Sequence, residues 1–288
     1  MRMLDVLRRR SDPELAESDI ALTNLKCATG LPHAETLDLT RCLDRIGRIA
    51  RQVRRETKRN LYRFRRCPKE WNGSEAYWTA CMMITVLQQD FGVRYNPERI
   101  YDPDFRDSRD LFIHGMLFGS GGTCASMPVL YVAVGRRLVY PLKLVHAKAH
   151  VFARWDDPQG RHWRHPARFN IEASNQGLNV FPDEYYHTWP LEMQDWELAE
   201  GCYLHSLSPR EELASFLAMR GHCLQDTRRF VEAAQVFRWA AKLAPKNPHY
   251  AGFRNVAMAL SGVPVPPGFE RFAYEAEREL ARTEALNK

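Results

Sequence analysis

The chain has 288 residues, 45% of them hydrophobic and 26% charged, and a formal net charge of +6. This composition is that of an ordinary soluble globular protein, and no apolar run is long enough to cross a membrane. No apolar segment follows the positive charges near the N-terminus, which argues against a signal peptide, so we expect a cytoplasmic protein without membrane contact. The seven cysteines are scattered and lack any C-x-x-C spacing, which argues against a disulfide scaffold and against a zinc site of the paired-cysteine kind.

Positive charge is concentrated between residues 45 and 66, in the run RIGRIARQVRRETKRNLYRFRR. Such a run can be a patch for nucleic acid or an acidic partner, or it can be the solvated face of one helix. The apolar residues between the arginines recur at roughly helical spacing; they are Ile46, Ile49, Val53, Leu61 and Tyr62. Because no recognition motif accompanies the run, we favour the solvated face and do not expect nucleic-acid binding.

The segment from residue 13 to residue 91 has a helical pattern. Ser11 and Glu14 form a capping signal for a first helix, which continues up to Gly30. A second helix begins near Asp38 and runs through the basic stretch. The third helix, AYWTACMMITVLQQDFG, is apolar nearly all round, which predicts a buried core helix.

The middle of the chain, from about residue 96 to residue 203, changes in character. A glycine cluster at 119–122 is followed by CASMPVLYVAVGRRL, whose composition predicts a buried helix. The apolar period then changes toward two, and PLKLV, HVFARW and FNIEAS each predict a strand. A buried helix followed by antiparallel strands indicates an α+β fold and not a parallel α/β sheet.

The last part of the chain is helical again, and its spacing matches a tetratricopeptide framework. The matching positions are Leu217, Gly221, Leu224, Ala233, Phe237, Ala240 and Pro245. Arg220 departs from the leucine that is usual before the glycine. Only one repeat can be identified, so we expect this helical hairpin to pack on the middle of the chain and not to form a free solenoid. Residues 266–288 predict a final amphipathic helix.

Cys124 is a candidate nucleophile, because it follows three glycines in the 119–122 cluster and precedes the buried helix. The glycines give the turn backbone freedom and leave the sulfur accessible. The N-terminus of a helix contributes partial positive charge and free N–H groups, which stabilise a thiolate and can bind a developing oxyanion. The other interpretation is that Cys124 is one more buried cysteine.

A nucleophilic cysteine needs an imidazole within reach and a third group that holds the other ring nitrogen. His150 opens the strand HVFARW, and Glu172 lies on the next strand, FNIEAS, with Asn170 two residues earlier on the same face. Adjacent antiparallel strands bring such side chains within reach of each other. The order cysteine, histidine, acid over this short stretch favours a Cys-His-acid site.

His146 is the main rival of His150, but the strand alternation begins at His150. His162 and His165 lie in a polar connection, where we expect solvent-exposed side chains. A metal site built from His146, His150 and Glu172 is the other chemistry that these residues allow. We disfavour it because VHAKAH lies between strand-like segments, so the two histidines do not have the i, i+4 spacing of a helix.

At these residues the sequence resembles the transglutaminase-like superfamily, specifically its bacterial SirB-like branch with a C-terminal tetratricopeptide-type segment. The stretches that carry the resemblance are GGTCASMPVLYVAVGRRLVYPLKLV, HVFARW, FNIEAS and YLHSLSPREELASFLAMRGHCL. The resemblance implies that Cys124 is the nucleophile, His150 the general base and Glu172 the orienting acid. Glu172 stands where the family has an aspartate, and Asn170 is close enough to take this role, as an amide does in papain-like enzymes. The family's glycine after RRL is Val139 here.

The implied fold is α+β, with N-terminal helices on a papain-like or transglutaminase core and a C-terminal tetratricopeptide-type segment. We divide the chain accordingly into an N-terminal helical part of the core domain at 1–95, a transglutaminase-like catalytic core at 96–205 and a tetratricopeptide-like helical segment at 206–288.

The expected activity is that of a cysteine peptidase, amidase or acyltransferase that forms a thioester on Cys124 from an amide or ester. We expect a peptide or protein substrate and no metal or organic cofactor. The alternative is a protein-interaction module with a degenerate site, which binds a protein partner through the C-terminal helices. A nucleic-acid-binding protein that uses residues 45–66 would instead lose affinity steeply with added salt.

Overall fold

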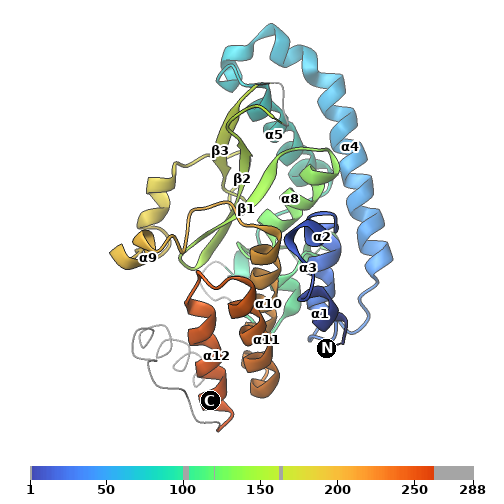
Figure 1. The fold of residues 1–288 in the computed structure, drawn as a ribbon. Helices are drawn as coiled ribbons and strands as arrows, with labels where there is room; N and C mark the ends of the chain where they lie inside the picture. Colours follow the sequence, from blue (N-terminus) through green and yellow to red (C-terminus); the bar gives the residue numbers. More distant parts are fainter. Residues whose placement is uncertain (1, 100–103, 120, 162–164, 263–288) are drawn as a thin grey trace.

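The computed structural model describes residues 2–99, 104–119, 121–161 and 165–262. The amphipathic helix predicted at 266–288 lies outside these residues. A three-stranded sheet stands in the middle of the molecule, the helices of the first half of the chain cover one side of it, and the C-terminal helices lie beyond one end (Figure 1). No helix among the described residues has both the length and the apolar character that a membrane span requires.

The N-terminal region begins with three short helices, α1 (Arg2–Leu7), α2 (Asp12–Ala16) and α3 (Ile20–Ala28). The capping signal is confirmed, because the Ser11 N–H donates to the Glu14 carboxylate at 2.8 Å. The prediction of one continuous helix from this cap to Gly30 is wrong. Asp19 starts a new helix by accepting a hydrogen bond from the Ala21 N–H at 2.8 Å, so the chain turns between α2 and α3.

The basic stretch forms the long helix α4 (Leu39–Arg66), which is capped by Asp38. Ile46, Ile49 and Val53 are buried on one face, as the solvated-face interpretation requires. Tyr62 does not share that face, since it is 59% exposed. The C-terminal end of α4 rises past the sheet (Figure 1).

The predicted core helix is confirmed as α5 (Glu75–Thr85), which continues into a π-helical turn, η2 (Val86–Asp90). Short elements connect it to the next long helix; they are η1 (Pro68–Trp71) before it, and η3 (Pro97–Arg99), α6 (Ser108–Leu111) and α7 (His114–Leu117) after it. The buried helix α8 (Met127–Arg137) packs against the sheet.

The sheet consists of β1 (Leu142–Ala147), β2 (His150–Asp157) and β3 (Ala167–Ile171), in the order β1-β2-β3 with antiparallel neighbours. The predicted α+β arrangement with antiparallel strands is therefore confirmed. Ala153 pairs with Ile171, and because side chains alternate along a strand, His150 and Glu172 project from the same face. Glu172 lies just beyond β3, where its N–H donates to the Asn179 carbonyl at 2.9 Å.

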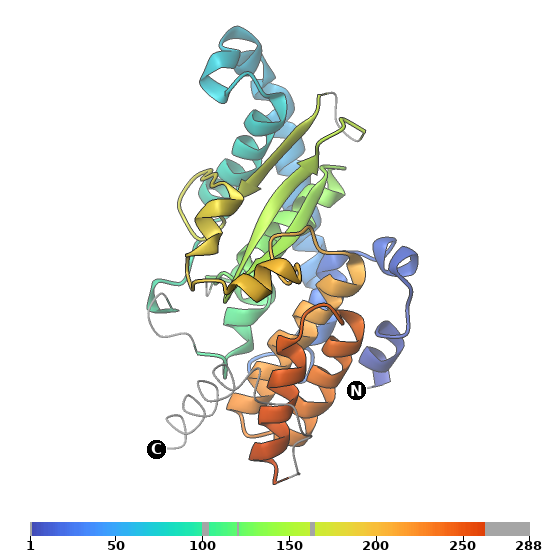
Figure 2. The ribbon, with the colours of Figure 1, turned by 60° about the vertical axis from the view of Figure 1, so that its left-hand side comes forward.

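Two apolar clusters hold the sheet in place. The main core joins the apolar face of β2 and β3 to α3, α4, α5 and α8, and it continues into the C-terminal helices. A smaller cluster lies on the other face, where Val145 and Phe152 contact Tyr186 and Met193. This second cluster fixes the segment that contains η4 (Asp183–His187) and α9 (Asp195–Ala199), shown in yellow in Figure 2.

The C-terminal helices are α10 (Pro209–Asp226), α11 (Phe230–Leu243) and α12 (His249–Leu260). They pack side by side below the sheet (Figure 2). Gly221 lies so close to the Phe237 ring that a Cβ at this position would come within 2.5 Å of it. Arg220, which departs from the repeat pattern, is buried and donates to the carbonyls of Cys27 and Thr29 at 2.8 and 2.9 Å. It therefore caps the end of α3 and ties these helices to the N-terminal region.

Candidate functional site

The turn before Cys124 is held by a short pairing with residues 94–96. The Gly122 N–H donates to the Arg94 carbonyl at 3.0 Å, and the Asn96 N–H donates to the Gly122 carbonyl at 2.8 Å. Gly121 has a φ of +85°, and a Cβ there would lie 3.1 Å from the Asn96 Cα, so glycine is the residue that fits this close approach. The glycine cluster thus allows the start of the turn to pack against residues 94–96, in addition to giving the turn backbone freedom.

Cys124 lies three residues before the first residue of α8, so the helix starts later than the sequence predicts. The turn is nevertheless helical in its bonding, because the Met127 N–H donates to the Thr123 carbonyl at 2.9 Å. The Ala125 N–H donates to the Thr123 hydroxyl at 3.2 Å, which is the bond of an N-cap. Cys124 therefore occupies a first-turn position, where the helix itself offers no partner to a backbone N–H.

Ser126 and Thr123 anchor this turn to the body of the protein. The Thr123 N–H donates to the Ser126 hydroxyl at 3.0 Å, and both hydroxyls donate to the Asp110 carbonyl, at 2.7 and 3.0 Å. Thr123 and Ser126 are buried, whereas Cys124 between them is partly exposed. The arrangement presents the sulfur at the surface of a rigid turn.

His150 and Glu172 form a buried pair on the face of the sheet where the sequence places them. The His150 Nε2 lies 2.8 Å from a Glu172 oxygen. The Tyr186 hydroxyl donates to that oxygen at 3.2 Å, and the Ser174 N–H donates to the other oxygen at 2.9 Å. Three donors therefore fix the carboxylate, which in turn fixes the orientation of the imidazole.

Cys124 is the second partner of His150. Burial alone would lower the pKa of His150, but hydrogen bonds with Cys124 and Glu172, together with their charges, raise it to about 9. Burial alone would raise the pKa of Glu172. The hydrogen bonds from His150 and Ser174 outweigh this effect and keep the pKa of Glu172 below its usual value. Since Glu172 occupies Nε2, the other ring nitrogen, Nδ1, is left for the thiol. The structure thus brings Cys124, His150 and Glu172 together.

Asn170 is not part of this cluster, although it lies on the same face. Its oxygen accepts a hydrogen bond from the buried Arg154 side chain at 2.7 Å. Its amide nitrogen donates to the Phe181 carbonyl at 2.9 Å and to the Asp183 carboxylate at 2.8 Å. With oxygen and nitrogen both engaged, the amide side chain of Asn170 is committed to a neighbouring network, and the imidazole is held by Glu172.

Three aromatic residues at the site escape prediction from the sequence. The Tyr95 hydroxyl lies within hydrogen-bonding reach of both the backbone and the thiol of Cys124, and burial together with the charge of Cys124 raises the pKa of this phenol. Trp189 meets the His150 ring edge-on, with 4.6 Å between the ring centres, and the Tyr186 hydroxyl donates to Glu172. The aromatic run YYHTW was a compositional signal for the last two, but nothing local marks Tyr95.

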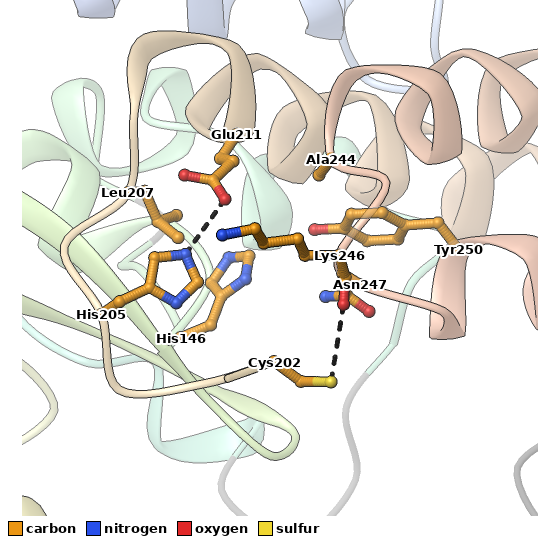
Figure 3. A pocket seen from close by; sticks show the side chains of 9 residues that line it. All are labelled: His146, Cys202, His205, Leu207, Glu211, Ala244, Lys246, Asn247 and Tyr250. Carbon is orange, nitrogen blue, oxygen red and sulfur yellow. Dashed lines mark hydrogen bonds and ion pairs between the residues drawn. The ribbon is translucent and has the colours of Figure 1, made fainter. Parts of the chain in front are cut away.

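His146, the rival histidine, lies on the opposite face of the sheet, because it pairs with Val151 whereas His150 pairs with Ala147. Its Nε2 lies 2.9 Å from the Ser215 hydroxyl, and burial lowers its pKa to about 4. Figure 3 shows it in a small pocket between the sheet and the C-terminal helices. The alternative of a metal site formed with His150 and Glu172 is therefore wrong, and the described residues contain no cluster of three or more ligating side chains that could hold a metal ion.

A family model of the transglutaminase-like superfamily matches residues 40–217, which is more than half of the chain. The matched range contains the Cys124 turn, α8, the whole sheet and the segment with η4. Searches among curated proteins and among solved structures found no match. The family match alone shows what the chain is: it belongs to the transglutaminase-like superfamily.

Proposed function

We propose that this chain is a cysteine enzyme that acts on an amide or ester carbonyl and passes through a thioester on Cys124. The observation that carries the proposal is the single imidazole of His150, which contacts both Cys124 and the buried carboxylate of Glu172. A cysteine bonded to an imidazolium has the electrostatic surroundings of a nucleophilic thiolate.

In the first step, the Cys124 thiolate attacks the carbonyl carbon and forms a C–S bond, while the carbonyl electrons move onto the oxygen. The proposal assigns the N–H of Cys124 and the hydroxyl of Tyr95, which interact with each other at the site, as donors to that oxyanion. When the intermediate collapses, the C–N or C–O bond breaks. The leaving amine or alcohol takes the proton of the His150 imidazolium, and the acyl group stays on the sulfur.

In the second step, water or an amine attacks the thioester and passes its proton to His150. The C–S bond breaks, the acid or the new amide leaves, and the thiolate–imidazolium pair is restored. Glu172 takes no proton in either step; it orients the imidazole and stabilises its positive charge. Attack by water makes the protein a peptidase or amidase, and attack by an amine makes it an acyltransferase.

An acyl-donor screen tests the proposal. An activity-based probe with a thiol-reactive acyl group should label the wild-type protein and leave the Cys124→Ala variant unlabelled. Cys42→Ala, which removes a fully buried thiol elsewhere in the core, is the matched control and should label like the wild type. Labelling that survives Cys124→Ala would refute the assignment of the nucleophile.

The family branch, the cellular compartment and the type of C-terminal segment are also part of the proposal. We infer that the chain belongs to the bacterial SirB-like branch, acts in the cytoplasm, and carries in α10–α12 a tetratricopeptide-type segment; the tight contact of Gly221 with Phe237 supports that last assignment. These helices are also the basis of the alternative, a degenerate module that binds a protein partner. In that case Cys124 would be alkylated only as an ordinary free thiol is, near about pH 8.5, and Cys124→Ala would retain full function.

A further inference from the structure

A row of aromatic side chains leads away from His150 along the surface. Trp189 meets the imidazole, the Tyr185 ring centre lies 5.4 Å from that of Trp189, and the Phe181 ring stacks on Tyr185 at 4.3 Å. Trp189 and Tyr185 are each 36% exposed, and Val180 beside the row is 37% exposed. Large apolar side chains are normally turned inward, so a contiguous exposed group that begins at a candidate site indicates a binding surface.

The same part of the chain is strongly acidic. Residues 169–209 contain seven Asp and Glu residues and no Lys or Arg, although the whole chain has a net charge of +6. Two of these carboxylates are neutralised by ion pairs, because Asp183 is bonded to the buried Arg154 and the buried Glu197 to Lys148. Glu184, in η4 next to Tyr185, and Glu192 are exposed instead. A hydrogen bond from the Met193 N–H to the His187 carbonyl at 2.8 Å closes a short loop. Trp189 and Glu192 both lie in this loop.

We propose that this acidic–aromatic face, formed by Phe181, Glu184, Tyr185, Trp189 and Glu192, binds the substrate, and that the substrate is a basic peptide with an apolar or aromatic side chain close to the reacting carbonyl. The proposal rests on the proposed function. The exposed rings take the apolar side chain next to His150, and the carboxylates attract lysine or arginine farther along the peptide. Both preferences come from one surface, so they should be found in one substrate.

The charge of the chain itself offers a competing occupant. Helix α4 holds eleven Lys and Arg residues against two acidic ones, so a second copy of the chain could place this helix on the acidic–aromatic face. A basic peptide is favoured because Trp189 lies against the candidate general base, where a substrate must pass and a structural partner would block access.

Binding can be measured without any chemistry, in the Cys124→Ala variant. The probes are a fluorescent peptide that alternates lysine with phenylalanine and leucine, a matched peptide with glutamate in place of lysine, and a third with alanine in place of the apolar residues. We expect the first to bind about tenfold more tightly than either of the others, as two or three exposed charge pairs and one buried ring would give. Its advantage over the glutamate peptide should shrink with added salt.

Two substitutions separate the contributions, each with a matched control. Glu184→Lys should remove the preference for lysine, whereas Glu70→Lys, the same change at an exposed site in η1, should not. Trp189→Ala should remove the preference for apolar residues, whereas Tyr62→Ala, at a more exposed aromatic residue on α4, should not. Glu184 is on the surface, so its variant keeps the test valid if Trp189→Ala fails to fold.

Equal binding of all three peptides, or an unchanged preference in Glu184→Lys, would overturn the inference. Concentration-dependent dimerisation that Glu184→Lys abolishes, with no peptide binding, would overturn it in favour of a second copy as occupant. Binding with the expected preferences but no turnover of the same peptides by the wild-type protein would leave the surface standing and count against the proposed reaction.

Discussion

The described part of the chain brings a cysteine, a histidine and a glutamate together in two places, and their bonding differs. The first cluster consists of Cys124, His150 and Glu172. The second lines the pocket of Figure 3 and consists of Cys202, His205 and Glu211. In both, a histidine nitrogen lies close to a glutamate oxygen, at 2.8 Å in the first and 3.0 Å in the second.

The two cysteines have different partners. Cys124 is partly exposed, and its thiol is bonded to the His150 imidazole. Cys202 is buried, and its thiol donates to the Lys246 carbonyl at 3.6 Å, a bond that requires the protonated form. A carbonyl holds a thiol protonated, whereas an imidazolium stabilises a thiolate.

The two histidines titrate in the same direction. The hydrogen bond with Glu211 raises the pKa of His205, and that of Glu211 falls to about 2, although burial opposes this change. A histidine–glutamate pair with a raised histidine pKa is therefore no sign of catalysis by itself. The comparison teaches that the group bonded to the thiol is the feature that distinguishes a candidate site from a structural pair.

The sharpest test of this difference replaces each of the two cysteines by alanine and compares the two variants. Cys124→Ala should lower turnover of any acyl donor by about 10³-fold or more, because the bond to the acyl group can no longer form. Cys202→Ala should leave turnover within about twofold of the wild type. Steady-state kinetics with one substrate checks both. A large loss of turnover in Cys202→Ala with an unchanged melting temperature would reverse the assignment of the two clusters.

The second prediction concerns the glutamates. Glu172→Gln should lower turnover by about 10²-fold, because an amide orients the ring but no longer stabilises its charge. The pKa of His150 should fall below about 9, and alkylation of Cys124 at pH 6 should slow with it. Glu211→Gln should lower the pKa of His205 and leave alkylation unchanged. Histidine titration by NMR and iodoacetamide kinetics give these readouts.

The same pKa fixes the pH dependence of stability. Because the pKa of His150 is raised above its usual value of about 6.5, the pair stabilises the folded state fully below about pH 6.5. This contribution is lost as the pH rises through about 9. Urea unfolding of Glu172→Gln should show a weaker loss of stability across this window. A curve parallel to that of the wild type would mean that Glu172 does not hold the charge of His150.

Substitution of Tyr95 should have a smaller effect on turnover, and it tests whether this residue contributes to catalysis or only to folding. Tyr95→Phe removes only the hydroxyl that reaches Cys124, so we expect a loss of about tenfold or somewhat more in kcat with KM nearly unchanged. Tyr131→Phe is the matched control, because its hydroxyl accepts a hydrogen bond from Gln88 at 3.0 Å inside the core. Equal losses in the two variants would show that Tyr95 acts through folding alone.

What could be predicted from the sequence follows from local rules. The alternation of strand residues is enough to place His150 and Glu172 on one face, and the glycine cluster is enough to mark the Cys124 turn. The same alternation also selected Asn170, because it identifies a face and not a bonding partner. The Arg154 side chain that donates to Asn170 is fully buried. Its burial could not be predicted, because charged side chains are normally exposed.

Contacts between distant parts of the chain could not be predicted. Tyr95 reaches Cys124 because its own segment pairs with Gly122, and no local pattern encodes such a pairing. Arg220, which departs from the pattern predicted for its segment, donates instead to the end of α3, almost two hundred residues away. The break between α2 and α3 is a different case, because Asp19 is a residue type that commonly caps a helix. The apolar residues on both sides of it keep helical spacing, so the pattern predicted one continuous helix.

Val139, where the resemblance predicts a glycine, provides the last and smallest test. The structure gives it a φ of +64°, in the left-handed region, and leaves its side chain 73% exposed. A β-branched residue in this conformation costs about 1–2 kcal/mol, whereas glycine adopts it freely at an entropic cost of about 0.5–1 kcal/mol. Val139→Gly should therefore raise the free energy of unfolding by about 0.5–1 kcal/mol.

The control for this gain is the same substitution in a right-handed helix. Val231 in α11 is 70% exposed, so Val231→Gly removes a side chain of equal exposure but relieves no strain. It should lower the free energy of unfolding by about 0.5 kcal/mol, since glycine is a poor helix former. Urea unfolding should shift the two midpoints in opposite directions at the same m-value. Two shifts of the same sign would mean that the turn after α8 accommodates valine without strain, and that valine in place of the glycine implied by the resemblance has no cost to the fold.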